Sequence, residues 1–246
     1  MINKQTLVAI AGLMLAPFVS ADMAGIEVGA YQWTPDYSGT VAADSSAINI
    51  EDDLGFKDDT HQIIWASIEH PLPLIPNFKV VSSDLSSSAT IELSEPLDFG
   101  GKTFNDNDEV AAIIDMSNIE YTLYYELLDN WINLDGGLTF RQYDGFVSLD
   151  TEATSAHQSL NFTIPLLYLK GRVDLPFTGF FVDGTVNIIS LDGNSLSDTE
   201  FSVGYESEIG LGAKVGFRTF AMDVDESGLL ADIEFKGAYI SAFFHF

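Results

Sequence analysis

The sequence predicts an all-β chain that folds as an antiparallel up-and-down transmembrane β-barrel of ten strands, with eight strands as the alternative. Three observations support this prediction. Apolar and polar residues alternate with a period of two from Gly25 to Phe246, and no convincing helical pattern interrupts them. Short and long connections alternate along the chain. The final segment is an alternating strand that ends in an aromatic residue, Phe246.

Each of the ten expected strands is a run of alternating residues bounded by turn-forming residues. They are Gly25–Asp36, Thr60–His70, Phe78–Leu93, Ala111–Leu127, Trp131–Leu149, Ser159–Val173, Gly179–Leu191, Glu200–Glu206, Ile209–Val224 and Ile233–Phe246. The connections at 71–77, 128–130, 174–178 and 207–208 are short, and those between them are mostly longer and acidic. This asymmetry is typical of short periplasmic turns and longer external loops, so an even strand count leaves both termini in the periplasm.

One strand shows why a membrane is favoured over water. Leu211, Ala213, Val215 and Phe217 share one face, and Gly212, Lys214, Gly216 and Arg218 share the other. The apolar face would point inward in a soluble barrel and toward lipid in a membrane barrel. The polar faces of several strands carry charges of both signs, as a lumen would. Aromatic residues such as Tyr125, Trp131 and Phe180 stand at strand ends, where interfacial girdles are found.

The expected strand Ser159–Val173 contains a change of parity. Leu160, Phe162 and Ile164 share one parity, whereas Leu167, Leu169 and Val173 share the other. A β-bulge near Pro165 would turn both groups toward lipid, and bulges are places where sheets accept proline. The sequence therefore predicts a bulge there.

The N-terminus and the composition narrow the class of protein further. Residues 1–21 have the basic start, apolar stretch and small-residue end of a secretory signal peptide cleaved after Ala21, which leaves a single barrel domain at 22–246. Without Lys4, nine Lys and Arg oppose 37 Asp and Glu, a formal charge of −28 that disfavours nucleic acid and anionic lipid as partners. The chain has no cysteine, so no disulfide supports the exported fold.

Several short runs resemble the glycine-glycine family of bacterial outer-membrane β-barrel proteins. These are 68–73 (IEHPLP), 99–101 (FGG), 121–126 (YTLYYE), 192–198 (DGNSLSD), 237–239 (GAY) and 244–246 (FHF). The resemblance covers nearly the whole mature chain and implies an outer-membrane barrel. It implies no settled activity, so no catalytic residue follows from it.

The polar parity places a charge network in the lumen. Its expected members are Glu69, Lys79, Glu120, Glu126, Asp135, Arg141, Lys170, Arg172, Asp183, Glu206, Lys214 and Arg218, together with Glu27. A ten-stranded lumen is narrow, and buried charges persist when they are paired, so a structural plug is favoured over a solute path. At the C-terminus, Tyr239, Phe244 and Phe246 are the expected signal for the barrel-assembly machinery.

The predicted external loops carry 22 of the 37 acids, at 44–59, 92–109, 150–152, 192–200 and 223–234. The favoured interpretation is a solvated, repulsive surface, and the alternative is binding of divalent cations beside lipopolysaccharide phosphates. One segment fits the calcium-loop spacing, with Asp223, Asp225, Ser227 and Glu234 as oxygen donors. Because that template joins two strands here, a plain hairpin remains the favoured interpretation and no metal is expected.

The expected function is therefore that of a non-enzymatic outer-membrane barrel, either structural or a narrow porin-like conduit for small solutes, without cofactor. Its expected partners are outer-membrane lipid, lipopolysaccharide and the barrel-assembly machinery. An alternative from another class is an external-face lipid hydrolase that uses His157 as base and Ser159 as nucleophile. A third is an adhesin or receptor, which would rest on the acidic loops alone.

Overall fold

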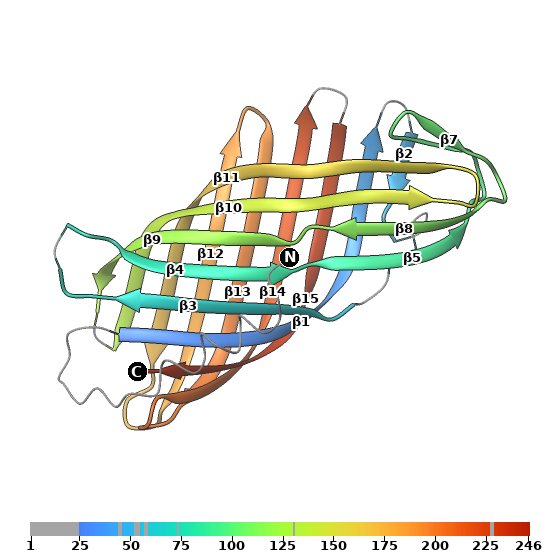
Figure 1. Cartoon of the computed structure of the whole chain (residues 1–246). Coiled ribbons are helices and arrows are strands. Elements are labelled where there is room, and N and C mark those ends of the chain that lie inside the picture. Colours follow the sequence, from blue (N-terminus) through green and yellow to red (C-terminus); the bar gives the residue numbers. More distant parts are fainter. Residues whose placement is uncertain are drawn as a thin grey trace, which may run out of the picture.

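The computed structural model describes residues 25–43, 46–51, 55–56, 59–72, 74–129, 131–226 and 229–246. The predicted signal peptide at 1–21 lies outside these residues. The regular elements of the described chain are all β-strands (Figure 1). They are β1 (Gly25–Ala43), β2 (Ser46–Asn49), β3 (His61–Glu69), β4 (Asn77–Asp84), β5 (Ser86–Glu92), β6 (Leu97–Phe99), β7 (Lys102–Phe104), β8 (Glu109–Asp115), β9 (Asn118–Leu128), β10 (Ile132–Asp150), β11 (Ser155–Asp174), β12 (Phe180–Leu191), β13 (Asn194–Glu206), β14 (Leu211–Glu226) and β15 (Leu229–His245).

The described residues contain no helix with the length and apolar character needed to cross a membrane.

Strand pairing closes into a ring of ten antiparallel strands, which confirms the predicted count. The order around the ring is β1, β3, β4, β9, β10, β11, β12, β13, β14 and β15, and β15 returns to β1. Closure gives the backbone groups of every strand a partner on both sides where all ten run together. Glu27 pairs with His245, so the first and last strands begin and end at the same end of the barrel.

We call the half of the barrel that holds Gly25, Phe246, the end of β9 at Leu128 and the turns at 175–179 and 207–210 the base half, and the other the distal half. The ring is complete only in the base half. Within the described chain, Leu167–Asp174 of β11 pair with β12, whereas Ser155–Leu166 pair with β10 alone. In Figure 1, β5, β8, β10 and β11 run together to the right as one sheet, while β1 and β12 to β15 run upward as another.

Two predicted strands each divide in two at this boundary. The expected strand Phe78–Leu93 is β4 and β5 with a break at Leu85, and Ala111–Leu127 is β8 and β9 with a break at 116–117. The breaks lie side by side, since the Met116 N–H donates to the Leu85 carbonyl at 2.9 Å and the Leu85 N–H donates to Ser117 Oγ at 3.1 Å. Each break lets the chain leave the ring and continue in the distal sheet.

The apolar side of the sheet changes between the two halves. In the base half the large exposed apolar side chains point outward, for example on Leu123, Phe201 and Ile240, while polar groups such as Arg141 and Ser202 are buried inside. In the distal half the inward side chains are apolar and buried, and the outward ones are polar. The buried distal set includes Tyr37, Val110, Ala112, Leu149, Leu196, Phe220, Ile233 and Phe235.

The change is visible along β14. Toward the base, its outward residues Val215 and Phe217 are apolar and its inward residues Lys214 and Arg218 are charged. Toward the distal half, the outward residue Thr219 is polar and the inward residue Phe220 is apolar. An apolar exterior fits lipid, and a polar exterior over an apolar core fits water. The base half is therefore the part suited to a bilayer, and the distal half is a water-exposed extension with a hydrophobic core.

This change corrects the prediction of a bulge near Pro165. The register between β10 and β11 runs without interruption from Ile132 opposite Val173 to Asp150 opposite Ser155. Leu160 and Ile164 pack against the distal core and do not face lipid. The parity change is thus the point where the apolar face of β11 turns from lipid to core. The irregularity in β10 lies instead between Leu134 and Asp135, in its pairing with β9.

Two predicted acidic loops are largely strands. Asp192 and Gly193 have positive φ values of 51° and 88° and form a two-residue turn, so β13 begins at Asn194 and not at Glu200. Similarly, β14 continues to Glu226 and β15 begins at Leu229 within the predicted loop 223–234. The predicted loop 92–109 contains the β6–β7 hairpin, whose Phe99 and Phe104 are buried in the distal core.

Candidate functional site

The centre of the lumen is closed by two arginines that share one carboxylate. Arg141 Nη2 lies 2.6 Å from Asp198 Oδ2. Arg218 donates to both oxygens of the same carboxylate, from Nε at 2.9 Å and from Nη2 at 2.6 Å. The three side chains are only 1–3% exposed. Because they come from β10, β13 and β14, the contacts join separate parts of the barrel wall across its interior.

Further polar groups complete this layer. Arg141 also pairs with Glu120 at 2.8 Å, and Arg218 Nη1 donates to the Tyr31 hydroxyl at 2.7 Å. The Tyr31 hydroxyl in turn donates to Glu200 at 3.0 Å. We call Tyr31, Glu120, Arg141, Asp198, Glu200 and Arg218 the central charge layer.

Aromatic rings cover the central charge layer where the distal core begins. The Arg218 guanidinium lies 4.6 Å from the centre of the Trp33 ring, and the Arg141 guanidinium lies 5.8 Å from the centre of the Phe220 ring. Both distances fall within the range of cation–π attraction. The layer is thus the boundary between the polar lumen of the base half and the apolar core of the distal half.

A second set of ion pairs lies nearer the base. Lys214 pairs with Asp183 at 3.1 Å, and Asp183 also accepts a hydrogen bond from Ser202. Arg172 pairs with Glu206 and with Asp174, each at 2.8 Å. These contacts join β11, β12, β13 and β14 across the base half.

The remaining predicted lumen residues are less tightly paired. Lys170 is 3.8 Å from Asp135, and Glu69 accepts a hydrogen bond from Tyr124 at 2.8 Å. Within the described residues, Lys79 and Glu126 have no ion pair within 4.0 Å. The lumen contains a central cavity of about 50 Å³, which is lined by Lys79, Glu120, Lys170, Arg172, Asp183 and Lys214 among others. A cavity of this size has room for a few water molecules and for no larger solute.

Asp198 and Glu200, two members of the central charge layer, were not predicted as lumen residues because 192–200 was interpreted as an external loop. The signal that could have placed them is Asp192-Gly193, which is a strong two-residue hairpin turn. Counting forward from that turn in steps of two puts Leu196, Asp198 and Ser202 on one face of β13, the buried inward face.

The residues of the alternative hydrolase lie on the outer face of β11. Ser159 Oγ and His157 Nε2 are 3.5 Å apart, and both residues are exposed. The His157 ring stacks on Phe146 with 4.9 Å between ring centres. A nucleophile and its base need closer contact and a third group that orients the base, and within the described residues no carboxylate contacts His157. This geometry does not favour acyl-lipid hydrolysis.

The calcium-loop residues do not form one loop, because they are divided between two paired strands. Asp223 and Asp225 lie in β14, whereas Glu234 lies in β15 and pairs with Lys236 at 2.8 Å. Ser227 lies outside the described residues. In the described part of the chain, no group of three or more His, Asp or Glu side chains is arranged to hold a metal ion.

No protein-family model matches the chain, and no curated protein matches it in sequence. Solved structures with a similar fold include the transport unit of the autotransporter AIDA-I from Escherichia coli, at 7% identity and a TM-score of 0.42, covering 98% of this chain and 95% of that one. The translocator domain of the autotransporter NalP from Neisseria meningitidis has 11% identity and a TM-score of 0.42, with 98% and 94% covered. An outer membrane channel from Pseudomonas putida F1 has 11% identity and a TM-score of 0.41, with 94% and 100% covered. At scores this low, the architecture rests on the strand pairing of this chain itself.

Proposed function

We propose that this protein is a non-enzymatic outer-membrane β-barrel with a closed lumen and a structural role. The observation that carries this proposal is the central charge layer, in which Asp198 binds Arg141 and Arg218 together across the barrel interior. The apolar outer face of the base half supports placement in a membrane. The partners proposed with it are outer-membrane lipid, lipopolysaccharide and the barrel-assembly machinery, and the termini lie on the periplasmic side.

The test is a planar-bilayer recording of the purified wild-type protein. We expect no single-channel steps, because the central cavity is about 50 Å³ and the distal core lies beyond it. Reproducible steps of one size would contradict the closed-lumen proposal. A known open porin, inserted in the same bilayer, controls for the recording.

A narrow conduit for small solutes is the second candidate. It is favoured by the small cavity beside Lys79, whose ammonium has no ion-pair partner among the described residues. If wild-type steps are seen, their reversal potential in a salt gradient identifies the ion that passes. A reversal potential that shifts on Lys79→Gln would assign Lys79 to the path.

The terminal strand provides a test of assembly. The outward face of β15 carries Ala238, Ile240, Ala242 and Phe244, and Phe246 follows directly after the strand. Tyr239 is buried and packs on Tyr31 with 4.9 Å between ring centres. Deleting Phe246, or replacing it with Asp, should block assembly while export continues, since the end of this strand would no longer be apolar. We would measure the folded protein in outer membranes by its heat-modifiable migration on gels. Folded amounts equal to wild type would mean that Phe246 is not part of an assembly signal.

A further inference from the structure

The distal half of the barrel leaves one long strand edge without a partner. Ser155–Leu166 of β11 pair with β10 on one side, and within the described residues no strand or loop backbone pairs with their other side. β12 pairs with β11 only as far as Ile188, opposite Leu167, and then runs away from it (Figure 1). We call the unpaired side of Ser155–Leu166 the β11 edge.

The opposite border of the same distal sheet is in contact with the rest of the chain. That border is β5, where a Cβ atom on Gly55 would meet Ile91 Cγ2 at 2.6 Å. Ser87 Oγ also donates a hydrogen bond to Asp59 Oδ2 at 3.4 Å. The chain that follows β2 therefore lies against β5, and the β11 edge is the longer and more open of the two borders.

The β11 edge lacks the usual protection of an exposed strand. Native sheets guard their edges with charged residues, proline or a bulge. Residues 153–169 contain no Asp, Glu, Lys or Arg, although the chain has 37 acids. The register with β10 is uninterrupted, and Pro165 stands at the base end of the edge. Its N–H and C=O groups therefore offer a template for one more strand.

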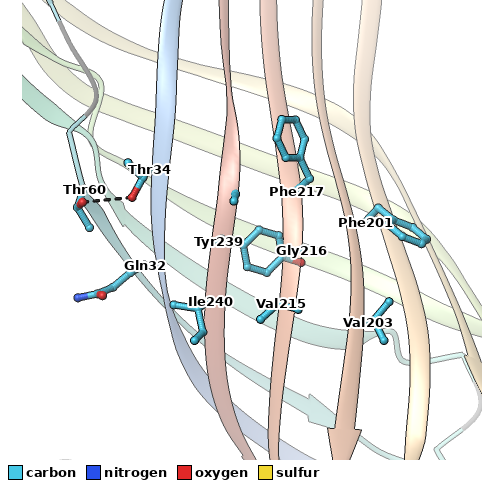
Figure 2. A pocket seen from close by; sticks show the side chains of 11 residues that line it. Gln32, Thr34, Thr60, Phe201, Val203, Val215, Gly216, Phe217, Tyr239 and Ile240 are labelled. Carbon is cyan, nitrogen blue, oxygen red and sulfur yellow. Dashed lines mark hydrogen bonds between the residues drawn. The ribbon is translucent and has the colours of Figure 1, made fainter.

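The inner side of the β11 edge is incompletely covered. Leu160 and Ile164 pack against the distal core. Phe162 lies between them on the same face but is 39% exposed, and its ring centre is 4.8 Å from that of the buried Tyr143. On the fully paired wall the exposed apolar side chains stand on the outer face instead, as Phe201 does (Figure 2). An added strand with apolar side chains on its inner face would cover Phe162.

Charge and geometry indicate an uncharged strand of another protein as the occupant. The net charge of −27 repels an acidic strand, and the β11 edge contains no carboxylate for a basic one. Two copies of this chain in one membrane would be related by rotation about the membrane normal. Because barrel strands tilt by about 35–45°, facing strands of two such copies would cross at about 70–90° and could not pair.

We propose that the β11 edge accepts an extended, uncharged segment of a partner protein as an additional antiparallel strand, in the position that β12 leaves. The added strand continues the distal sheet, with polar side chains beside Ser159 and Thr163 and apolar ones beside Phe162. Main-chain hydrogen bonds provide the affinity, and the apolar alternation sets the register. The inference adds a partner to the proposed function, and it rests on that function only for the side of the membrane on which the partner lies.

The test is disulfide capture of a synthetic peptide by the purified protein in detergent. The probe has ten residues, alternating valine and threonine, with a cysteine at one central threonine position. The chain has no cysteine, so Thr163→Cys places one on the β11 edge and Gln142→Cys places one on β10. Thr163 and Gln142 are directly opposite each other, and both are exposed on the outer face. An added strand lies about 4.8 Å from β11 and about twice as far from β10, whereas a disulfide needs Cα atoms within about 7 Å.

We expect Thr163→Cys to capture at least tenfold more peptide than Gln142→Cys. The same peptide with all its backbone amides N-methylated should not be captured, because it cannot donate to the edge. Glutamate in place of threonine should lower capture, since the net charge of the chain repels it. Phe162→Ala, added to Thr163→Cys, should raise the peptide concentration for half-maximal capture about tenfold. Phe201→Ala on the outer wall is the matched control and should leave that concentration unchanged.

Equal or absent capture at the two cysteine positions would overturn the site, and capture of the N-methylated peptide would overturn strand pairing. A disulfide-linked dimer formed by Thr163→Cys and not by Gln142→Cys, without peptide, would show a second copy at the edge and overturn the proposed occupant. Heat-modifiable migration confirms that each variant is folded. Capture in detergent does not depend on a membrane, so its failure differs from failure of the proposed function, which soluble fractionation of the wild type would reveal.

Discussion

Asp198→Ala is expected to lower the free energy of unfolding by about 3–5 kcal/mol, because it leaves two buried guanidinium groups without the carboxylate they share. Arg141 would keep its ion pair with Glu120 at 2.8 Å, and Arg218 would keep its hydrogen bond to Tyr31 at 2.7 Å. Because of these remaining partners, the loss of unfolding free energy falls in the lower part of that range when water enters the space left by the carboxylate. We would measure it by thermal unfolding of the purified barrel in detergent.

The same variant should also change conduction. Without Asp198 the two guanidinium groups repel each other, and a leak conductance should appear in planar bilayers where the wild type is silent. Arg141→Ala and Arg218→Ala should each cost less than Asp198→Ala, since Asp198 keeps one arginine in either case. Asp223→Ala is the matched control: Asp223 is exposed on the adjacent strand β14, and its replacement should change stability by less than about 0.5 kcal/mol. If Asp198→Ala unfolds like the wild type and stays silent, the central charge layer is not what closes the lumen.

Phe235→Ala is expected to lower the free energy of unfolding by about 3–5 kcal/mol, because it opens a hole in the distal core. Phe235 is 4% exposed and packs against Tyr37 and Phe220, with ring centres 4.7 Å and 5.7 Å away. A lumen filled with water would not produce this loss, since the ring would have no packed neighbours. The measurement is again thermal unfolding in detergent.

Ile240→Ala on the same strand is the matched control for Phe235→Ala. Ile240 is 61% exposed on the lipid-facing side of the base half. Lipid or detergent tails are as apolar as the side chain removed, so the cost should stay below about 1 kcal/mol. Equal losses for the two variants would contradict the change of apolar side between the halves. A larger loss for Ile240→Ala would reverse the assignment of core and lipid faces.

The strand alternation determined the fold class from the sequence alone. A period of two fixes which residues share a face, and this predicted ten strands, both described chain ends at one end of the barrel, and Arg141, Lys214 and Arg218 on inward faces. Such inferences need only local information, because the side chains of a strand alternate wherever it lies.

Alternation cannot say which solvent each face meets, and this only the tertiary structure decided. Leu160 and Leu167 have opposite parity, and the sequence alone explained that with a bulge. In the structure the strand is regular, and its apolar face turns from lipid to the distal core. The shared partner of Arg141 and Arg218 also could not be predicted from strand alternation. Asp198 is 57 and 20 residues away from them in sequence, and only ring closure and the strand register bring the three together.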